Sequence, residues 1–313
     1  MTKPSIVVFP PIPPELRQTL TRSFDLIEFG GAALPPGLRV AVVTSVGGAD
    51  AALMDKMPNL GLIACNGTGL ERIDLREAAR RGIIVRNTPD EVTDDTADFA
   101  LGLIYATRRR LVEADRFVRA GRWKKERLTP SRRVLGCRVG IVGLGRIGRK
   151  IAARATGAGM AVSYTGPRRK QDQPYGFVAD IRQLAAAVDV LIVCCPGGPE
   201  TFRLIDAEVL NALGPDGFLI NVSRGDVVDE EALIGALSKG VIAGAGLDVF
   251  AREPDIDERF FAFDNVVLAP HYASVTLATR FAIAQTLHDS IAAFLNGQPV
   301  VDAAAEFRPR AAG

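Results

Sequence analysis

Three polar side chains in the second half of the chain form a set suited to acid/base chemistry on an anionic substrate. Arg224, Glu253 and His271 each follow a short apolar run that is typical of a buried strand. Ligands of open α/β sheets bind beyond the carboxyl ends of the strands, so we expect all three side chains at one edge of one sheet. Arginine fixes an anion, histidine gives or takes a proton, and glutamate orients the imidazole and raises its pKa. Alone, each residue could equally be structural, but their joint occurrence favours a catalytic site.

Histidine and cysteine usage narrows the chemistry further. The only histidines are His271 and His288, which excludes a metal site built from three histidines. His288 falls in the predicted last helix, where we expect a structural role. The cysteines show neither a C-x-x-C pair nor zinc-ligand spacing, and they predict reduced core thiols in a cytoplasmic protein. They are Cys65, Cys137, Cys194 and Cys195. A redox role for the adjacent pair is the alternative.

A glycine-rich turn precedes these side chains in the sequence. The segment 138–148 reads RVGIVGLGRIG and contains G-x-G-x-x-G between a predicted strand and an apolar helical stretch. That context is typical of a loop that binds a dinucleotide pyrophosphate at a helix N-terminus. A glycine turn without a ligand is the alternative. The predicted cofactor-binding residues of this loop are Gly143, Leu144, Gly145, Arg146, Ile147 and Gly148.

The end of the next predicted strand bears on the choice of dinucleotide. NAD sites place an acidic residue about 20 residues after the glycines, where it holds the ribose 2′-hydroxyl. Here the strand ends SYTGPRRKQD, with no acid between Gly148 and Asp172 and with Arg168 and Arg169 following Gly166. Guanidinium groups pair with a 2′-phosphate. We therefore predict that NADP(H) is preferred and NAD(H) possible; ordinary solvated loop charges are the alternative.

Two series of alternating strands and helices must position these residues. The first predicts strands at 5–9, 39–44, 61–65 and 83–86, with helices at 13–22, 49–57 and 75–81. The second predicts strands at 138–142, 160–165, 188–195, 217–222, 242–249 and 266–269. One long helix is expected over 94–122, capped by Asp94 or Asp95 and stopped by Gly121, and a last helix over 276–295. The fold class is α/β, with two doubly wound parallel-sheet domains.

Composition excludes several classes of protein. A chain of 313 residues suggests about two domains, and 48% hydrophobic residues exclude a mainly disordered protein. The 38 basic and 36 acidic residues balance, which argues against a nucleic-acid or membrane partner. No apolar run reaches the roughly 18 residues of a membrane helix, and prolines interrupt any N-terminal signal sequence, so we expect a cytoplasmic location.

One local charge bias departs from this balance. Residues 108–138 contain twelve Arg or Lys and only three acids. A nucleic-acid surface is one interpretation, although no nucleic-acid-binding motif accompanies it. The alternatives are a solvated helix face with a loop at a subunit contact, or attraction of an anionic substrate and cofactor.

Six stretches in this order resemble the D-isomer-specific 2-hydroxyacid dehydrogenases, a family that includes glyoxylate/hydroxypyruvate and hydroxyphenylpyruvate reductases. They are GLIACNGTGLERIDL, NTPDEVTDDTADFALGLIYATRRR, GIVGLGRIG, INVSRGDVVDEEAL, AGLDVFAREP and APHYAS. The resemblance implies that Arg224 binds the 2-oxo acid, that His271 protonates the carbonyl oxygen, and that Glu253 is the partner of that histidine. It also implies substrate contacts from Thr68, Gly69 and Leu70. Further implied cofactor contacts are Gly166, Arg168, Arg169, Cys195, Pro196, Thr201, Val222, Ser223 and Asp248, the last at the nicotinamide end.

The same resemblance implies an architecture and an activity. A flavodoxin-like substrate domain, residues 1–97 and 286–313, would contain an inserted Rossmann cofactor domain, residues 98–285. A homodimer would form through the long helix and the basic segment. Three positions depart from the family pattern: Ala273 after the histidine, Pro167 before the arginines, and NGTG in the substrate loop. We expect an NADPH-preferring reductase of small 2-oxo acids of the glyoxylate/hydroxypyruvate type. The alternatives are a hydroxyphenylpyruvate or 2-ketogluconate reductase, or a non-catalytic dinucleotide sensor or corepressor.

Overall fold

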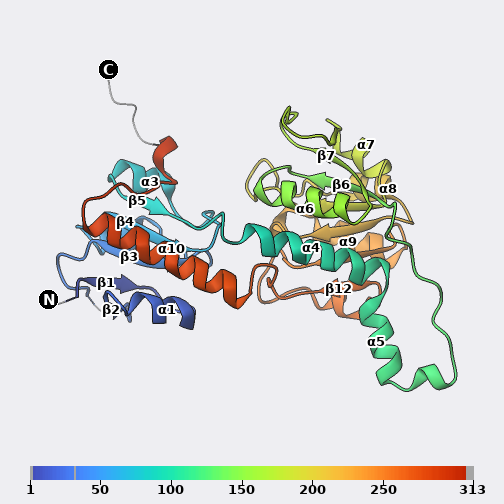
Figure 1. Ribbon diagram of the computed structural model, residues 1–313, viewed down its shortest axis with the longest axis horizontal. Helices are drawn as coiled ribbons and strands as arrows, with labels where there is room; N and C mark the ends of the chain where they lie inside the picture. Colours follow the sequence, from blue (N-terminus) through green and yellow to red (C-terminus); the bar gives the residue numbers. More distant parts are fainter. Residues whose placement is uncertain (1–2, 32, 308–313) are drawn as a thin grey trace. The chain divides into compact units, whose positions relative to one another are not determined.

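The chain folds into two α/β units. The computed structural model describes residues 3–31 and 33–307 (Figure 1). Unit 1 contains the described residues up to Val92 and those from Val275 onward, and unit 2 contains Thr93–Ser274. The chain therefore leaves unit 1, builds all of unit 2, and then returns to complete unit 1.

Unit 1 is built on a five-stranded parallel sheet in the order β2-β1-β3-β4-β5. Its strands are β1 (Ser5–Val8), β2 (Asp25–Glu28), β3 (Val40–Thr44), β4 (Leu62–Asn66) and β5 (Ile84–Arg86). This is the flavodoxin-like order. The central strands are continuous apolar runs because helices bury both faces of the sheet.

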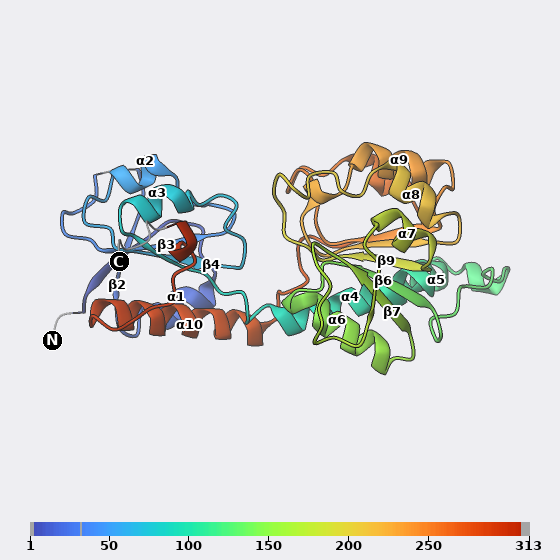
Figure 2. The ribbon, with the colours of Figure 1, turned by 90° about the horizontal axis from the view of Figure 1, so that it is seen from above.

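Helices cover the two faces of this sheet in pairs (Figure 2). The helices of unit 1 are α1 (Pro14–Leu20), α2 (Ala51–Asp55), α3 (Leu75–Arg80), α10 (Leu277–Leu295) and the 3₁₀ turn η4 (Ala305–Phe307). On one face, Leu16 of α1 and Leu287 of α10 pack with Val42 of β3. On the other face, Met54 of α2 and Ala78 of α3 pack on the opposite side of the same strands.

The sequence analysis missed the edge strand β2. The four predicted strands of unit 1 are present, but Asp25–Glu28 has charged ends and two half-buried residues between them. A four-residue edge strand of this composition contains no apolar run, so the sequence gives no signal for it. Its pairing with β1 forms only in the folded sheet.

Unit 2 contains a seven-stranded parallel sheet in the order β12-β11-β10-β9-β6-β7-β8. Its strands are β6 (Arg138–Val142), β7 (Ala161–Thr165), β8 (Gly176–Phe177), β9 (Val190–Val193), β10 (Phe218–Asn221), β11 (Gly244–Leu247) and β12 (Val266–Leu268). Numbered from β6, the order 3-2-1-4-5-6 of a Rossmann fold is extended by one strand. All six predicted strands are confirmed; the two-residue edge strand β8 was missed.

Helices also cover both faces of the second sheet (Figure 2). They are α4 (Thr93–Arg108), α5 (Leu111–Arg119), α6 (Arg146–Gly157), α7 (Ile181–Ala186), α8 (Ala207–Leu213) and α9 (Glu230–Ser238), with 3₁₀ turns η1 (Arg122–Lys124), η2 (Gly225–Val227) and η3 (Glu258–Ala262). Leu103 of α4 and Ile151 of α6 belong to one core, and Leu184 of α7, Leu210 of α8 and Leu233 of α9 belong to the other.

The single helix expected over 94–122 is wrong. It is divided at Arg110, whose φ of 53° is left-handed and cannot continue an α-helix. The guanidinium of Arg110 pairs with the carboxylate of Glu113, which holds this break. Asp94 and Asp95 lie in the first turn of α4, since the helix already begins at Thr93. Gly121, with φ of 69°, follows the end of α5 as expected.

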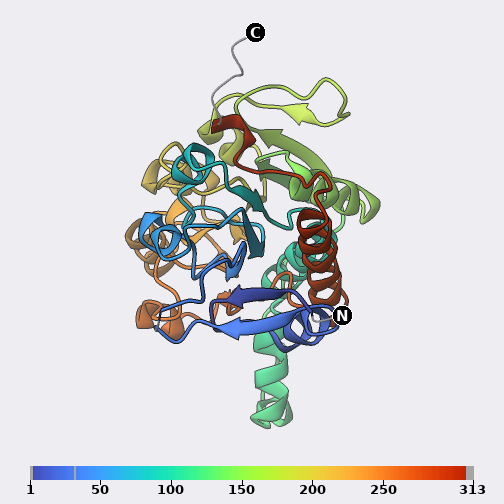
Figure 3. The ribbon, with the colours of Figure 1, turned by 90° about the vertical axis from the view of Figure 1, so that its left-hand side faces the viewer.

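The second part of the divided helix projects from the sheet of unit 2. Figures 1 and 3 show α5 standing away from that sheet. Leu111, Val118 and Trp123 are 52%, 54% and 59% exposed on this segment.

Within residues 3–31 and 33–307, no helix combines the length and the apolar composition needed to cross a bilayer.

Candidate active site

The glycine-rich loop makes a close backbone turn at the carboxyl edge of the second sheet. Gly143 has φ of 98°, and a Cβ there would lie 2.9 Å from the backbone of Cys195. A Cβ on Gly148 would lie 2.1 Å from the carbonyl oxygen of Gly143. Both positions therefore require glycine: one for the turn itself, the other for the close approach of α6 to β6.

The N-terminus of α6 is built to receive an anion. Gly145 is the N-cap residue, and no side chain caps the helix. The position of a Cβ on Gly145 has no atom within 4 Å, so the space above it is open. Uncapped amides and the helix dipole attract negative charge. These features fit the pyrophosphate of a dinucleotide, which Gly143 to Gly148 would hold.

The loop after β7 presents two exposed arginines and no competing acid. The Arg168 and Arg169 side chains are exposed. The backbone amide of Lys170 donates to the Tyr164 hydroxyl at 2.6 Å, which anchors the loop. Asp172 is engaged by Arg149, and this ion pair lowers the pKa of the Asp172 carboxyl. The loop thus offers positive charge at the strand end where NAD sites place an acid.

The loop after β9 is fixed by a hydrogen bond within itself and by one from its start to the glycine-rich loop. The Thr201 hydroxyl donates to the carbonyl of Pro196 at 2.7 Å, and the Cys194 thiol donates to the carbonyl of Gly143 at 3.1 Å. Burial raises the pKa of both adjacent thiols, that of Cys195 to about 11. Neutral thiols of this kind are poor nucleophiles. All four cysteines are free.

His271 and Glu253 form a hydrogen-bonded pair beyond β11 and β12. Nδ1 of His271 lies 2.8 Å from Oε2 of Glu253, and Oε1 of Glu253 accepts the backbone amide of Phe250 at 2.9 Å. The bond to Glu253 raises the pKa of His271. Burial opposes ionisation of Glu253, but the bonds from His271 and Phe250 outweigh it and the pKa of Glu253 is lowered. The pair therefore favours a charged imidazolium whose Nε2 remains for a substrate.

Asp248 holds the turn that presents the histidine. It is 1% exposed, and its two carboxylate oxygens accept the backbone amides of Tyr272 at 2.6 Å and Ala273 at 3.0 Å. The His271 amide donates to the Asp248 carbonyl at 2.8 Å, and His271 has a left-handed φ of 53°. The sequence analysis assigned Asp248 to the nicotinamide only. Burial raises the pKa of Asp248, and the two amides oppose that rise.

The Arg224 loop is shaped by a buried asparagine that the sequence analysis missed. Oδ1 of Asn221 accepts both the amide and the hydroxyl of Ser223, at 3.0 and 2.7 Å, and its Nδ2 donates to the Arg224 carbonyl at 3.0 Å. Nη1 of Arg224 donates to the Ser223 carbonyl at 2.7 Å. The only sequence signal was an amide side chain ending the apolar strand FLIN. Val222, also predicted to bind cofactor, is buried in this loop.

Gly225 brings the Arg224 loop against the Glu253 loop. A Cβ on Gly225 would lie 1.8 Å from the carbonyl carbon of Phe250, so the two backbones touch here. The positive charge of Arg224 in turn opposes protonation of His271, although the bond to Glu253 outweighs it. Unit 2 therefore brings the predicted catalytic set, Arg224, Glu253 and His271, to one edge of its sheet.

The predicted substrate loop, Thr68 to Leu70, belongs to unit 1 and follows β4. Nδ2 of Asn87 donates to the Thr68 carbonyl at 2.8 Å, and the Cys65 thiol contacts the Gly69 carbonyl at 3.8 Å. Among the described residues, the backbone amides of Thr68 and Gly69 donate no hydrogen bond. These amides are therefore available to an anion.

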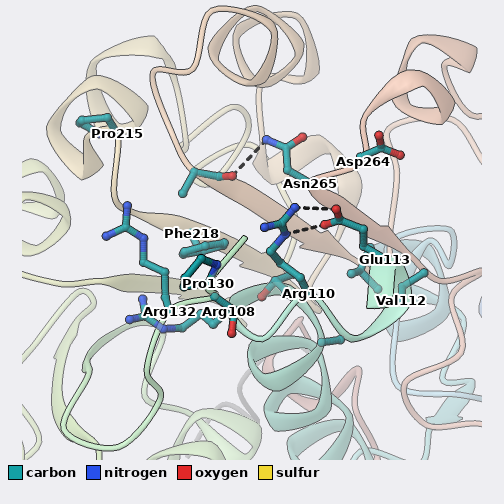
Figure 4. A pocket seen from close by; sticks show the side chains of 15 residues that line it. Arg108, Arg110, Val112, Glu113, Pro130, Arg132, Pro215, Phe218, Asp264 and Asn265 are labelled. Carbon is teal, nitrogen blue, oxygen red and sulfur yellow. Dashed lines mark hydrogen bonds and ion pairs between the residues drawn. The ribbon is translucent and has the colours of Figure 1, made fainter. Parts of the chain in front are cut away.

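A cavity of about 390 Å³ in unit 2 lies apart from the catalytic set (Figure 4). Its walls include Phe218 at the start of β10 and Asn265 just before β12, so it lies at the amino ends of the strands. Three arginines reach it, but Arg110 pairs with Glu113, Arg132 with Asp216, and Arg108 donates to the carbonyl of Arg133. In the part of the chain that the structure describes, no three potential metal ligands cluster.

Comparisons with known proteins assign the family. The model of the D-isomer specific 2-hydroxyacid dehydrogenase NAD binding domain matches residues 101–273. A hydroxyphenylpyruvate reductase of Plectranthus scutellarioides is 40% identical over 95% of this chain and 97% of its own length. A 2-ketogluconate reductase of Gluconobacter oxydans is also 40% identical, over 96% and 98%.

A solved structure extends the likeness to the whole fold. The NADPH-dependent glyoxylate/hydroxypyruvate reductase of Sinorhizobium meliloti, in complex with NADP and malonate, is 38% identical with a TM-score of 0.90, over 99% of this chain and 100% of that one. The two sheets and the acid/base pair define an α/β protein of the nucleotide-dependent dehydrogenase class. The chain belongs to the D-isomer specific 2-hydroxyacid dehydrogenase family.

Replacing Glu253 by glutamine tests the electrostatics of the pair. The carboxylate raises the pKa of His271, so the protonated form persists to higher pH than the ordinary value of about 6.5 allows. If His271 is a general acid, the rate of the reaction that takes its proton should fall as pH rises through the His271 pKa. In Glu253→Gln this alkaline limb of kcat/KM should move to lower pH. An unshifted limb in the pH profile would contradict the assignment.

Proposed function

We propose that this chain is an NADPH-preferring reductase that converts small 2-oxo acids of the glyoxylate/hydroxypyruvate type to D-2-hydroxy acids. The 2.8 Å pair of His271 and Glu253, at the same sheet edge as the glycine-rich cradle, is the observation that supports it most directly. Relatives named as reductases of hydroxyphenylpyruvate and 2-ketogluconate, and a structural neighbour named as a glyoxylate/hydroxypyruvate reductase, also support it.

In the proposed reaction the substrate is fixed before the proton moves. Arg224 binds the anionic 2-oxo acid, and Thr68, Gly69 and Leu70 are proposed as further substrate contacts. NADPH, when bound, supplies the hydride for the carbonyl carbon. His271 gives its Nε2 proton to the carbonyl oxygen, so the product is a neutral hydroxyl, and Glu253 stabilises the imidazolium before transfer. Asp248 keeps the His271 turn in position, and Asn221 keeps the Arg224 loop in position.

Replacing His271 by asparagine tests general acid catalysis. Loss of the proton donor should lower kcat roughly 10²- to 10⁴-fold with NADPH saturating. His288→Asn is the matched control, because that histidine bonds Ser23 within unit 1 and has no proposed part in the reaction. Near-native turnover of the His271 variant would contradict the proposal. NADPH binding with no turnover of any 2-oxo acid by the wild type would instead favour a dinucleotide sensor or corepressor.

The arginines after β7 support the preference for NADPH. Arg168 and Arg169 are exposed next to Gly166, whose Cβ position has no neighbour within 4 Å. The 2′-phosphate of NADPH would form charge-assisted hydrogen bonds with these guanidinium groups. NADH has no phosphate at this position and would form none of them. Single alanine variants distinguish binding of the 2′-phosphate through one arginine from binding through both.

Alanine substitutions measure this preference. Hydrogen bonds to charged groups contribute about 1.5–3 kcal/mol, so Arg168→Ala or Arg169→Ala should raise KM for NADPH roughly 10- to 100-fold. The KM for NADH should hardly change. Lys239→Ala, an exposed cation at the end of α9, is the control. Wild-type kcat/KM values that are equal for the two cofactors, or higher for NADH, would refute the preference.

A homodimer is proposed on the exposed apolar side chains of α5 and η1. Leu111, Val118 and Trp123 lie more than half exposed on a segment that stands away from its own sheet. A second copy of the chain would remove this surface from water. Val118→Asp should therefore reduce the mass measured by light scattering from twice 33.4 kDa to that of one chain. The matched variant Val301→Asp, also at an exposed valine, should remain dimeric; a monomeric wild type would contradict the proposal.

The four free cysteines support a cytoplasmic location. Disulfides are rare in reducing compartments and common in secreted proteins. Cys65 and Cys137 are buried and have raised pKa values because of their burial, Cys65 to about 12. Buried thiols of this kind form no disulfide, so the fold does not depend on an oxidising compartment.

A further inference from the structure

The loop between β11 and η3 carries Glu253 and has little cover of its own. Phe250 at its start and Phe260 in η3 are buried, whereas residues 251–255 between them are exposed. Apart from a bond made by the Ala251 amide, the backbone of residues 251–253 makes no hydrogen bond to the described part of the chain. Exposed segments with few hydrogen bonds have low local stability. The position of Glu253 therefore depends on how this segment is attached at its start.

Glu230 supplies the attachment. Its Oε1 accepts the backbone amide of Ala251 at 2.7 Å. Glu230 is half-buried and is the first residue of α9, whose N-cap is Asp229 with its own bond to the Ala232 amide. The Glu230 carboxylate thus connects α9 to the loop after β11.

A backbone contact holds the same peptide. A Cβ on Gly225 would lie 1.8 Å from the carbonyl carbon of Phe250 and 2.2 Å from the nitrogen of Ala251. The peptide between Phe250 and Ala251 is therefore packed against the backbone of the Arg224 loop as well as hydrogen-bonded to α9. Together the two contacts fix the direction in which the chain continues toward Glu253, two residues further on.

The Glu253 side chain needs that direction for both of its bonds. Its Oε1 accepts the Phe250 amide at 2.9 Å, and its Oε2 lies 2.8 Å from Nδ1 of His271. The consecutive amides of Phe250 and Ala251 thus donate to two different carboxylates, those of Glu253 and Glu230. Releasing the second amide would loosen the turn that the first amide helps to close, and with it the bond to His271.

The neighbouring Glu231 contacts the same loop in a different way. Nη1 of Arg259, beyond Glu253 in the chain, donates to Oε2 of Glu231 at 3.0 Å. The Glu231 side chain is 70% exposed, and an ion pair so exposed contributes little to stability. Arg259 also pairs with Asp257, so it keeps a partner without Glu231. Of these two adjacent glutamates, Glu230 is the one that binds the loop backbone.

We propose that Glu230 is a positioning residue of the acid/base site: through the Ala251 amide it holds the segment that places the Glu253 carboxylate on Nδ1 of His271. For its effect on catalysis the inference rests on the proposed function. The largest effects of charge on the pKa of His271 come from Glu253, Arg224 and Asp248. Glu230 therefore acts on the histidine through the position of Glu253.

Three substitutions separate the hydrogen bond of Glu230 from its charge. Glu230→Gln keeps an acceptor at the same reach and loses the charge. Glu230→Asp keeps the charge, with its favourable interaction at the N-terminus of α9, but is one methylene too short to reach the amide. Glu230→Ala loses both. A residue that only stabilised the helix would be replaced well by aspartate, whereas a positioning residue would be replaced well by glutamine.

Titration of the imidazole measures the outcome without turnover. The chain has only two histidines, so His288→Asn leaves His271 as the one imidazole seen by NMR. In that background the pKa of His271 should fall toward the ordinary value of about 6.5 in Glu230→Ala and Glu230→Asp, because the bond to Glu253 is what raises it. It should keep its wild-type value in Glu230→Gln and in the control Glu231→Ala.

The same variants connect the position of Glu253 to the reaction. With glyoxylate and saturating NADPH, kcat should fall roughly 3- to 30-fold in Glu230→Ala, as expected for the loss of one hydrogen bond. The KM for NADPH should hardly change, and Glu230→Gln should restore kcat.

The outcomes separate this inference from the proposed function. A His271 pKa that is unchanged in Glu230→Asp, or that falls equally in Glu230→Gln or Glu231→Ala, would overturn the positioning role even if glyoxylate is reduced. The expected pKa pattern without turnover of any 2-oxo acid would leave that role intact and refute the reductase. If Glu230→Ala does not fold, the comparison of glutamine with aspartate decides alone.

Discussion

Every loop of the candidate site in unit 2 begins at the same edge of one sheet, because all seven strands pair in parallel. This constraint brings together residues that are more than a hundred positions apart in the chain, from Gly143 after β6 to His271 after β12. The alternation of strands with helices fixes the edge, and short loops then set the position of each side chain. The parallel strand directions already determine where these residues come together, and the other features of the site only adjust their positions.

At that edge, the buried polar side chains of Asp248 and Asn221 fix the conformations of two loops. Asp248 binds two amides of the histidine turn, and Asn221 ties the segment from Ser223 to Arg224. Each is 1% exposed and has its polar atoms satisfied by backbone groups nearby. Buried polar groups with complete hydrogen bonding specify a single conformation, whereas an apolar replacement would leave the amides of the loop without partners. The charge balance around His271 depends on the same supports, since Glu253 and Arg224 act on it in opposite directions.

The sequence predicted the repetitive part of this structure and the residues with distinctive chemistry. Buried parallel strands are apolar runs, so β6 and β9 to β12 were visible, as was the glycine turn between strand and helix. The edge strands β2 and β8 were not, because they are short and half-buried, and their existence depends on a neighbour. The break at Arg110 depends on one residue adopting a left-handed conformation, which helical periodicity does not reveal. The structural roles of Asn221 and Asp248 were not visible either. Asn221 fixes a local turn through bonds to Ser223 and Arg224, and Asp248 binds amides that lie 24 and 25 residues away in the chain, and no spacing rule encodes either arrangement.

The return of the chain to unit 1 has a consequence for the order in which the molecule is completed. β1 to β5 are all synthesised within the first 86 residues, but α10 covers one face of that sheet and spans Leu277–Leu295. Until the ribosome has made those residues, Val42 and Leu62 lack part of their apolar cover. Unit 2 is continuous in sequence and has no such dependence. A nascent chain can therefore finish the nucleotide-binding unit while the first unit still exposes an open apolar surface, so the first unit to be translated is the last to be sealed.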